Sequence, residues 1–80
     1  MLNEFESVRD ITAEVMKTDP ETIRERTRFI EDLCADSLEL FEILTRIEEI
    51  HRIALRRDAV LLVRTVGDAA KLLEERELRN

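Results

Sequence analysis

Ser37 is the side chain best placed for chemistry, because it lies between Asp36 and Leu38 where a helical pattern of apolar residues begins. A serine hydroxyl is a weak nucleophile unless a neighbouring base activates it. The only histidine, His51, comes 14 residues later, and along one helix that spacing amounts to about 20 Å. With neither a base nor oxyanion donors beside the serine, a free-standing hydrolase is disfavoured, and any activation must come from a second protein.

The start of a helix suits a different chemistry at Ser37, the attachment of a phosphate group. Helix N-termini present free backbone N–H groups and the positive end of the helix dipole. The carboxylate of Asp36 opposes a phosphate there unless a cation or a partner intervenes. Taken alone, a serine at this position more often only caps the helix. Cys34, the single cysteine, lies close to Ser37, and both a functional thiol and a residue of no chemical role remain open.

Ser37 must be positioned by the long segment before it. A first helix is predicted over residues 3–17 from apolar positions three and four apart, namely Phe5, Val8, Ile11, Thr12, Val15 and Met16. Residues 18–36 then form a long loop, in which Asp19 and Pro20 can support a brief helical turn. A loop of this length without structure is unusual, so we expect short turns anchored by Ile23, Phe29, Ile30 and Leu33.

A second helix is predicted from Asp36 or Ser37 to about His51, with Asp36 and Glu39 as a capping box in which Asp replaces the usual Ser or Thr. Its buried stripe is expected to contain Leu40, Ile43, Leu44, Ile47 and Ile50. A different face carries Leu38, Phe41 and Thr45, with four glutamates nearby. This helix therefore combines an apolar inner face with an acidic outer one.

Two further helices complete an all-α fold. A short third helix is predicted from a capping Asp58 through Val63, and residues 59–63 cannot all face inward, so part of this surface should be apolar. Thr65 and Asp68 mark the N-cap of a last helix. Its packing residues are expected to be Val66, Ala69, Ala70, Leu72 and Leu73, and residues 74–80 are expected to fray. The prediction is a four-helix bundle, with a long loop between helices one and two and a short third helix, in a single domain over residues 1–80.

The net charge of −6 is uneven, because residues 1–50 hold 14 acidic and 6 basic residues whereas residues 51–80 hold 5 and 7. This makes nucleic acid a poor partner and a basic protein surface a good one, although acidity also serves solubility alone. A single cysteine permits no internal disulfide, and the N-terminus lacks the regions of a signal peptide. The longest apolar run is far shorter than the roughly 20 residues of a membrane span. We expect a cytoplasmic monomer that does not insert into membranes.

Three blocks of the sequence occur in the order and spacing of a known family. They are Phe29, Glu31-Asp32 and Leu33; then Asp36-Ser37-Leu38 followed by Glu42, Ile43, Ile47, Glu48 and Glu49; then Thr65-Val66-Gly67-Asp68-Ala69. Over residues 4–76 the pattern resembles the acyl carrier proteins and their phosphopantetheine attachment site. The resemblance implies the same four-helix fold and a protein that is not an enzyme, with no catalytic residues of its own.

The resemblance further implies that Ser37, flanked by Asp36 and Leu38, carries a covalent 4′-phosphopantetheine donated by coenzyme A. A phosphopantetheinyl transferase attaches the group with Mg²⁺, which belongs to that enzyme, so no metal is assigned to this chain. The thiol of the arm tethers acyl groups as thioesters. Tethering raises their effective concentration at partner enzymes of fatty acid, lipid or polyketide-type synthesis.

In this family the second helix is the main recognition element, so Leu38 and Phe41 are implied as apolar contacts. The charged contacts, which would meet Arg and Lys on partner enzymes with basic surfaces, are Glu39, Glu42, Glu48 and Glu49. Such charges chiefly speed encounter and select partners, and they weaken with salt. A solvated helix face is the alternative for the glutamates, and a core position is the alternative for Phe41. Acyl chains can enter the bundle in this family. The residues that could line such a pocket are Ile43, Ile47 and Leu62, and the simpler interpretation is that they are ordinary core residues.

The chain departs from the family pattern at several places. Cys34 stands where Gly is usual, and a cysteine is strained there if the position needs φ > 0. Arg56-Arg57 replaces what is commonly Pro plus an acid, the third helix is apolar, and His51 stands where an aromatic is typical. These changes favour a specialised carrier with dedicated partners over neutral drift.

Two alternatives remain from other classes. One is a non-modified acidic helical module that binds a basic partner and never needs Ser37. The other is an aminoacyl or peptidyl carrier domain, which is disfavoured because those commonly have Gly before the serine motif and a less acidic helix.

Overall fold

The computed structural model describes residues 3–78 and shows the expected all-α fold. Its elements in chain order are α1 (Glu4–Met16), the 3₁₀ turn η1 (Pro20–Thr22), α2 (Ser37–His51), α3 (Arg57–Val60) and α4 (Val66–Leu78). The long connection between α1 and α2 is as predicted, and so is the shortness of α3, although not its bounds. Among the described residues, no helix is long and apolar enough to cross a membrane.

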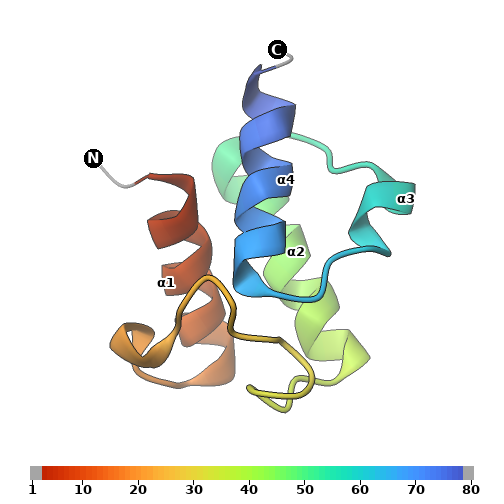
Figure 1. Cartoon of the computed structure of the whole chain (residues 1–80). Helices are drawn as coiled ribbons and strands as arrows, with labels where there is room; N and C mark the ends of the chain where they lie inside the picture. Colours follow the sequence, from red (N-terminus) through yellow and green to blue (C-terminus); the bar gives the residue numbers. More distant parts are fainter. Residues whose placement is uncertain (1–2, 79–80) are drawn as a thin grey trace.

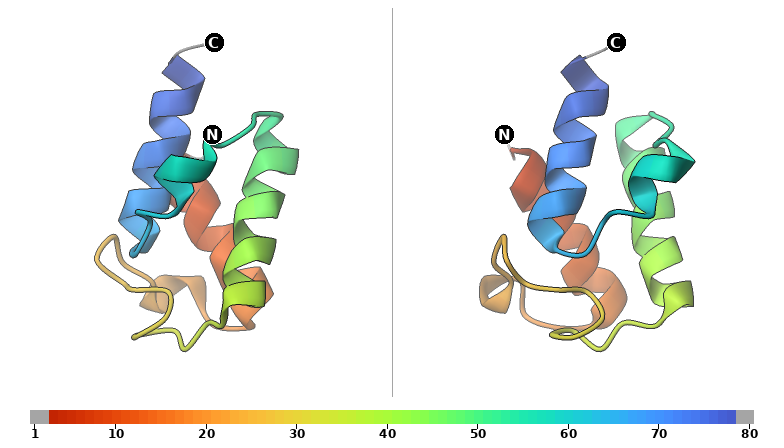
Figure 2. Two further views of the ribbon diagram at one scale, coloured as in Figure 1. Left: turned by 90° about the vertical axis from the view of Figure 1, so that its right-hand side faces the viewer. Right: turned by 45° about the vertical axis from the view of Figure 1, so that its right-hand side comes forward.

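The three long helices form the body of the bundle. In Figure 1, α2 and α4 run upward while α1 runs downward, so that α1 is antiparallel to both, and it packs against both. Figure 2 shows α3 lying across one side of the molecule, between α2 and α4. The loop before α2 passes beneath the first turn of α4 in every view, and it therefore reaches the end of the bundle where α2 begins.

Local sequence signals set the helix starts. The predicted capping box of α2 is confirmed, since the Asp36 side chain accepts from the backbone N–H of Glu39 and Glu39 accepts from that of Asp36. At α4, the Asp68 N–H donates to Thr65 Oγ1 at 3.0 Å, and the N–H groups of Arg64 and Thr65 donate to the Asp68 carboxylate. The hydrogen bond from the Arg64 N–H is the main reason why the pKa of Asp68 lies below its usual value, and the bonds with Thr65 lower it further. The predicted turn is also present, with Asp19 capping η1.

The core includes side chains from the loop as well as from the helices. The largest fully buried side chains are Phe29, Ile23, Ile43, Ile47, Leu73, Val8, Val66 and Thr12. Of the expected α2 stripe, Leu44 is also buried and Leu40 packs partly against the core. The prediction for Ile50 is wrong, since 61% of this residue is exposed. In the last turn of α2 it is His51, the next residue, that bonds to α1 and α4.

Two other helix predictions need correction. Asp58 lies inside α3, whose N-cap is Arg56 without a side-chain hydrogen bond, and the helix ends at Val60 where Val63 was expected. The end of α4 is helical through Leu78, where fraying from residue 74 was expected. Bonds to other elements hold this last turn, because Arg76 Nε donates to the carbonyl oxygen of Ala54 at 2.9 Å.

His51 links the ends of the three long helices. Its Nε2 lies 2.8 Å from Ser7 Oγ on α1, and its Nδ1 lies 3.1 Å from Glu77 Oε2 on α4. Only 18% of the His51 side chain is exposed. The histidine therefore serves as a polar clamp between helices, at the opposite end of α2 from Ser37.

Replacing His51 should destabilise the bundle without touching the serine motif. We expect His51→Ala to lower the free energy of unfolding by about 1–2 kcal/mol, because two partly buried hydrogen bonds are lost. Urea unfolding followed by circular dichroism measures the change. Glu49→Ala is the control, since Glu49 is exposed on the same helix and should change stability by less than about 0.5 kcal/mol. Equal effects of the two variants would show that the clamp contributes nothing.

Candidate functional site

Ser37 is the first residue of α2, and it is exposed. Within residues 3–78 its hydroxyl takes part in no hydrogen bond. The cap of the helix is instead Asp36, whose Oδ1 accepts from the Glu39 N–H at 2.8 Å, while Glu39 Oε1 accepts from the Asp36 N–H at 3.0 Å. The helix start is thus complete without the serine, and the Ser37 oxygen is left available to an incoming reagent.

The loop that precedes Ser37 is hydrogen-bonded to the segment just before α4. The N–H of Phe29 donates to the carbonyl oxygen of Arg64 at 3.0 Å, and the N–H of Ala35 donates to that of Phe29 at 2.9 Å. Phe29 and Ala35 are 1% and 4% exposed. Hence the last loop residues before Ser37 are held by backbone bonds on one side and by a buried aromatic ring on the other.

An ion pair within this loop closes its turn. The guanidinium of Arg28 hydrogen-bonds the carboxylate of Asp32, with a shortest ion-pair distance of 3.1 Å, and the Arg28 N–H donates to the same carboxylate at 2.8 Å. These contacts lower the pKa of Asp32, chiefly through the side-chain bond from Arg28, and they raise the pKa of Arg28. Both side chains are exposed to solvent, so the pair shapes the loop more than it stabilises the fold.

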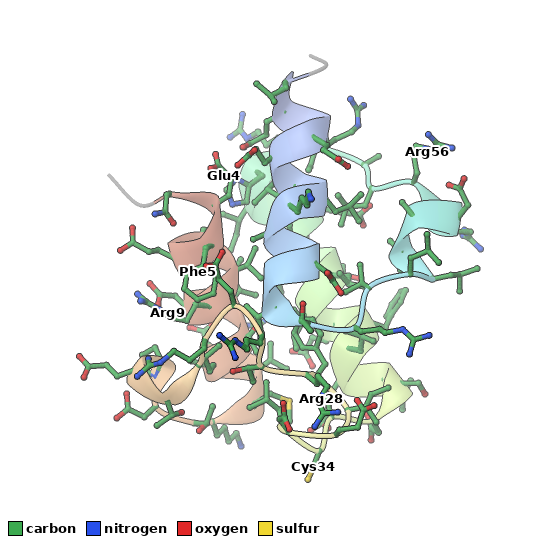
Figure 3. All side chains as sticks on the ribbon, viewed as in Figure 1. Glu4, Phe5, Arg9, Arg28, Cys34 and Arg56 are labelled. Carbon is green, nitrogen blue, oxygen red and sulfur yellow. The ribbon has the colours of Figure 1, made fainter. Side chains whose placement is uncertain are left out.

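Cys34 occupies a left-handed backbone conformation, with φ of 58°. Its side chain is exposed, and Figure 3 shows it pointing away from the ribbon at the lower end of the molecule. The strain anticipated for a residue with a Cβ at this position is therefore present, because only glycine adopts this region without a steric cost. The thiol makes no hydrogen bond with any other described residue.

Replacing Cys34 by glycine should stabilise the protein. We expect Cys34→Gly to raise the free energy of unfolding by about 0.5–1 kcal/mol, since relief of the left-handed strain exceeds the extra chain entropy of glycine. Thermal unfolding under reducing conditions measures this. Cys34→Ala removes the thiol and keeps the Cβ, so it should leave the stability nearly unchanged. A stabilisation by Ala equal to that by Gly would place the effect in the thiol and not in the backbone.

The outer face of α2 presents two large apolar side chains. Leu38 is 77% exposed and Phe41 is 68% exposed. The alternative of a core position for Phe41 is therefore wrong. Both side chains follow Ser37 within the first two turns of the helix, so a protein that reaches Ser37 would meet them.

The four glutamates of α2 differ in how they are used. Besides the capping role of Glu39, Glu42 pairs with Arg46 at 3.0 Å, and Glu48 Oε2 accepts from the Leu55 N–H at 2.8 Å. Arg46 also bonds Glu14 on α1. Glu49 is exposed and has no ion pair within the described residues. Glu48 thus closes the turn after α2, a role that its sequence position alone did not reveal.

An open hollow of about 330 Å³ lies between α2 and α3. Its lining residues are Phe41, Leu44, Thr45, Glu48, Leu55, Arg57 and Val60. The residues considered for a pocket are placed elsewhere: Ile43 and Ile47 are fully buried, and Leu62 is 76% exposed, which also excludes it from the core. Leu55 was missed in the sequence, and Arg57 was noted only as a departure from the family pattern, because only tertiary folding brings them to the same hollow as Phe41.

The arrangement fits phosphopantetheine attachment and no hydrolytic chemistry at Ser37. An exposed, unpartnered hydroxyl at a helix N-terminus accepts a phosphodiester without displacing a buried group, and the helix dipole favours the charge. His51 is at the far end of α2 and is occupied by Ser7 and Glu77. No group of metal-ligating side chains occurs in residues 3–78.

Comparison with known proteins agrees with this geometry. A family model described as "Phosphopantetheine attachment site" matches residues 6–73. The acyl carrier protein of Phenylobacterium zucineum is 42% identical over 76 residues, covering 95% of this chain and 96% of the relative. The acyl carrier protein of Caulobacter vibrioides is 42% identical over 72 residues, covering 90% of this chain and 92% of the relative. That of a Sulfurovum species is 36% identical over 70 residues, covering 88% of this chain and 93% of the relative. With a family match over most of its length and relatives aligned over nearly all of theirs, this chain belongs to the acyl carrier protein family.

Proposed function

We propose that Ser37 is the attachment residue for 4′-phosphopantetheine in this chain, which as a member of its family is a phosphopantetheine-bearing acyl carrier. The observation that supports this most is the exposed Ser37 hydroxyl, which has no hydrogen-bond partner among the described residues and lies at the start of α2. The proposed role is delivery of acyl thioesters to enzymes of fatty acid, lipid or polyketide-type synthesis. The chain itself would catalyse no step. A reducing compartment such as the cytoplasm suits its free, exposed cysteine.

The modification requires the Ser37 oxygen to attack the phosphorus that links phosphopantetheine to the nucleotide in coenzyme A. A serine–phosphate ester bond forms, the pyrophosphate bond breaks, and adenosine 3′,5′-bisphosphate leaves. A base on the transferase takes the serine proton, since the described residues offer none beside Ser37. This chain contributes a fixed helix start and an accessible oxygen.

Partner enzymes are proposed to bind the outer face of α2. Leu38 and Phe41 would supply apolar contact, because both are largely exposed. Of the acidic contacts, Glu42 and Glu49 are exposed, whereas Glu39 and Glu48 are partly buried and bond the backbone of their own chain. We therefore expect Glu49, which has no ion pair within residues 3–78, to contribute most to encounter with basic partners and its salt dependence, followed by Glu42, whose charge is shared with Arg46.

Intact mass spectrometry tests the attachment. The purified chain is incubated with coenzyme A, Mg²⁺ and a broad-specificity phosphopantetheinyl transferase, beside a carrier of known reactivity. The expected result is the gain of one phosphopantetheine, mapped to the peptide that contains Ser37. If the other carrier is modified and this chain is not, the proposal fails for that transferase, and the non-modified interaction module becomes the better description.

A further inference from the structure

The segment around α3 leaves large apolar side chains in solvent. Leu61 is 83% exposed and Leu62 is 76% exposed. A helix of one turn offers too little surface to bury the whole run 59–63, of which Val63 is buried in the core and Val60 packs partly against it. Figure 2 shows that this segment lies beside α2, the helix that Ser37 begins.

Basic side chains flank these leucines. Arg57 is the first residue of α3, and Arg64 follows the segment; both are exposed. Neither guanidinium makes an ion pair within residues 3–78, whereas Arg56 pairs with Asp58 at 2.7 Å. Two uncompensated positive charges therefore border an apolar surface, in a chain whose net charge is −6.

Two open hollows bring the arginines together with exposed apolar side chains. The hollow between α2 and α3 has both Phe41 and Arg57 in its lining. A second hollow of about 240 Å³ is lined by Phe29, Ile30, Glu31, Leu40, Leu61, Val63 and Arg64. The two hollows are neighbours, because Leu40 and Leu44 lie one turn apart on the same side of α2 and Val60 and Leu61 are adjacent in the chain. We call their shared surface the α2–α3 face and define it by Ile30, Phe41, Arg57, Leu61 and Arg64.

We propose that the α2–α3 face docks a partner enzyme whose contact surface carries carboxylates around a projecting apolar group. The inference rests on the proposed function, because the partner is taken to be an enzyme that acts on the group at Ser37. Charge complementarity carries the assignment: Arg57 and Arg64, which make no ion pair within residues 3–78, suit carboxylates, and the exposed Leu61 and Phe41 suit an apolar group. The same partner would meet Glu42 and Glu49 with basic side chains, so its surface is acidic on one side and basic on the other.

Other occupants fit the observations less well. An anionic membrane surface attracts Arg57 and Arg64 but repels a chain of net charge −6. A second copy of the chain would set the α2 glutamates of one molecule against the arginines of the other, but it carries the same net charge. A protein surface can place carboxylates opposite Arg57 and Arg64 and basic side chains opposite the α2 glutamates. A uniformly anionic membrane cannot match both sets of charges.

Two helical model peptides test the charge preference on the full chain. Both carry the same leucine face, and one has a rim of glutamates while the other has a rim of lysines. We expect the glutamate-rimmed peptide to shift backbone amide NMR signals of residues 57–64. Arg57→Glu should weaken its binding roughly tenfold, as expected when like charges are juxtaposed. Arg26→Glu changes the net charge equally on an exposed loop residue and should leave the affinity nearly unchanged.

Several results would overturn the inference. In the peptide experiment these are equal binding of the two peptides at residues 57–64, or equal losses of affinity from Arg57→Glu and Arg26→Glu. A dimer in sedimentation that Arg57→Glu dissociates would assign the face to a second copy. Binding to phosphatidylglycerol vesicles that Arg57→Glu abolishes would assign it to a membrane. Each variant is also assayed for phosphopantetheine transfer by intact mass. Failure of the wild type in that assay counts against the proposed function, whereas normal transfer without peptide preference counts against the docking face alone.

Discussion

Ser37→Ala is expected to abolish phosphopantetheine transfer completely while leaving the fold and its stability unchanged. The variant removes the only oxygen that the proposed chemistry uses. Because the Ser37 hydroxyl makes no hydrogen bond among the described residues, and Asp36 caps the helix, the free energy of unfolding should change by less than about 0.5 kcal/mol. Intact mass after incubation with coenzyme A and the transferase measures the first effect, and thermal unfolding measures the second.

Ser7→Ala is the matched control, because Ser7 is the only other serine. Its hydroxyl lies 2.8 Å from His51 Nε2, so this variant should lose some stability and keep full modification. The two variants thus separate chemistry from folding. A remaining mass gain in Ser37→Ala would place the attachment at another residue, and a large loss of stability in that variant would give Ser37 a structural role.

Phe29→Ala is expected to lower the free energy of unfolding by about 3–5 kcal/mol, as found when a buried aromatic ring is removed. Phe29 is 1% exposed and is the largest fully buried side chain among residues 3–78. A small domain has roughly 5–15 kcal/mol of stability in total, so this variant should be marginally folded. Urea unfolding measures the loss. Ile30→Ala, at the neighbouring residue that is 57% exposed, should cost less than about 1 kcal/mol.

The same variant should loosen the approach to Ser37. The Phe29 backbone bonds Arg64 and Ala35, and these bonds depend on the ring that holds the loop against the core. In Phe29→Ala at low temperature, amide hydrogen exchange should therefore rise most at Phe29 and Ala35, ahead of α1. Uniform acceleration along the chain would show that the loop unfolds only together with the bundle.

Much of the site could be predicted because its signals are local. The capping box needs only Asp36 and Glu39 three residues apart, and it fixes where α2 begins. Thr65 and Asp68 do the same for α4. The left-handed strain at Cys34 also followed from residue type and the family pattern. Each of these features lies within one turn of chain, where backbone geometry dominates.

The failures concern features that depend on distant residues. Ile50 fits the apolar period of α2 but is exposed, because α1 and α4 approach the neighbouring position, His51. The last turn of α4 looks polar, but Arg76 and Glu77 bond to the turn after α2 and to its last residue. The extent of α3 was misjudged because a one-turn helix has too few residues to show a period.

The amino-acid sequence by itself determined the helical class, the starts of α2 and α4, the place of Ser37 between Asp36 and Leu38 at a helix start, and the family to which the chain belongs. Tertiary structure alone decided which α2 glutamates bond within the chain, that His51 joins three helices, and that Arg57 and Phe41 line the same hollow. The reason is the range of the interactions. Caps and periods act over three or four residues, whereas burial and charge pairing depend on segments that meet only when the chain has folded.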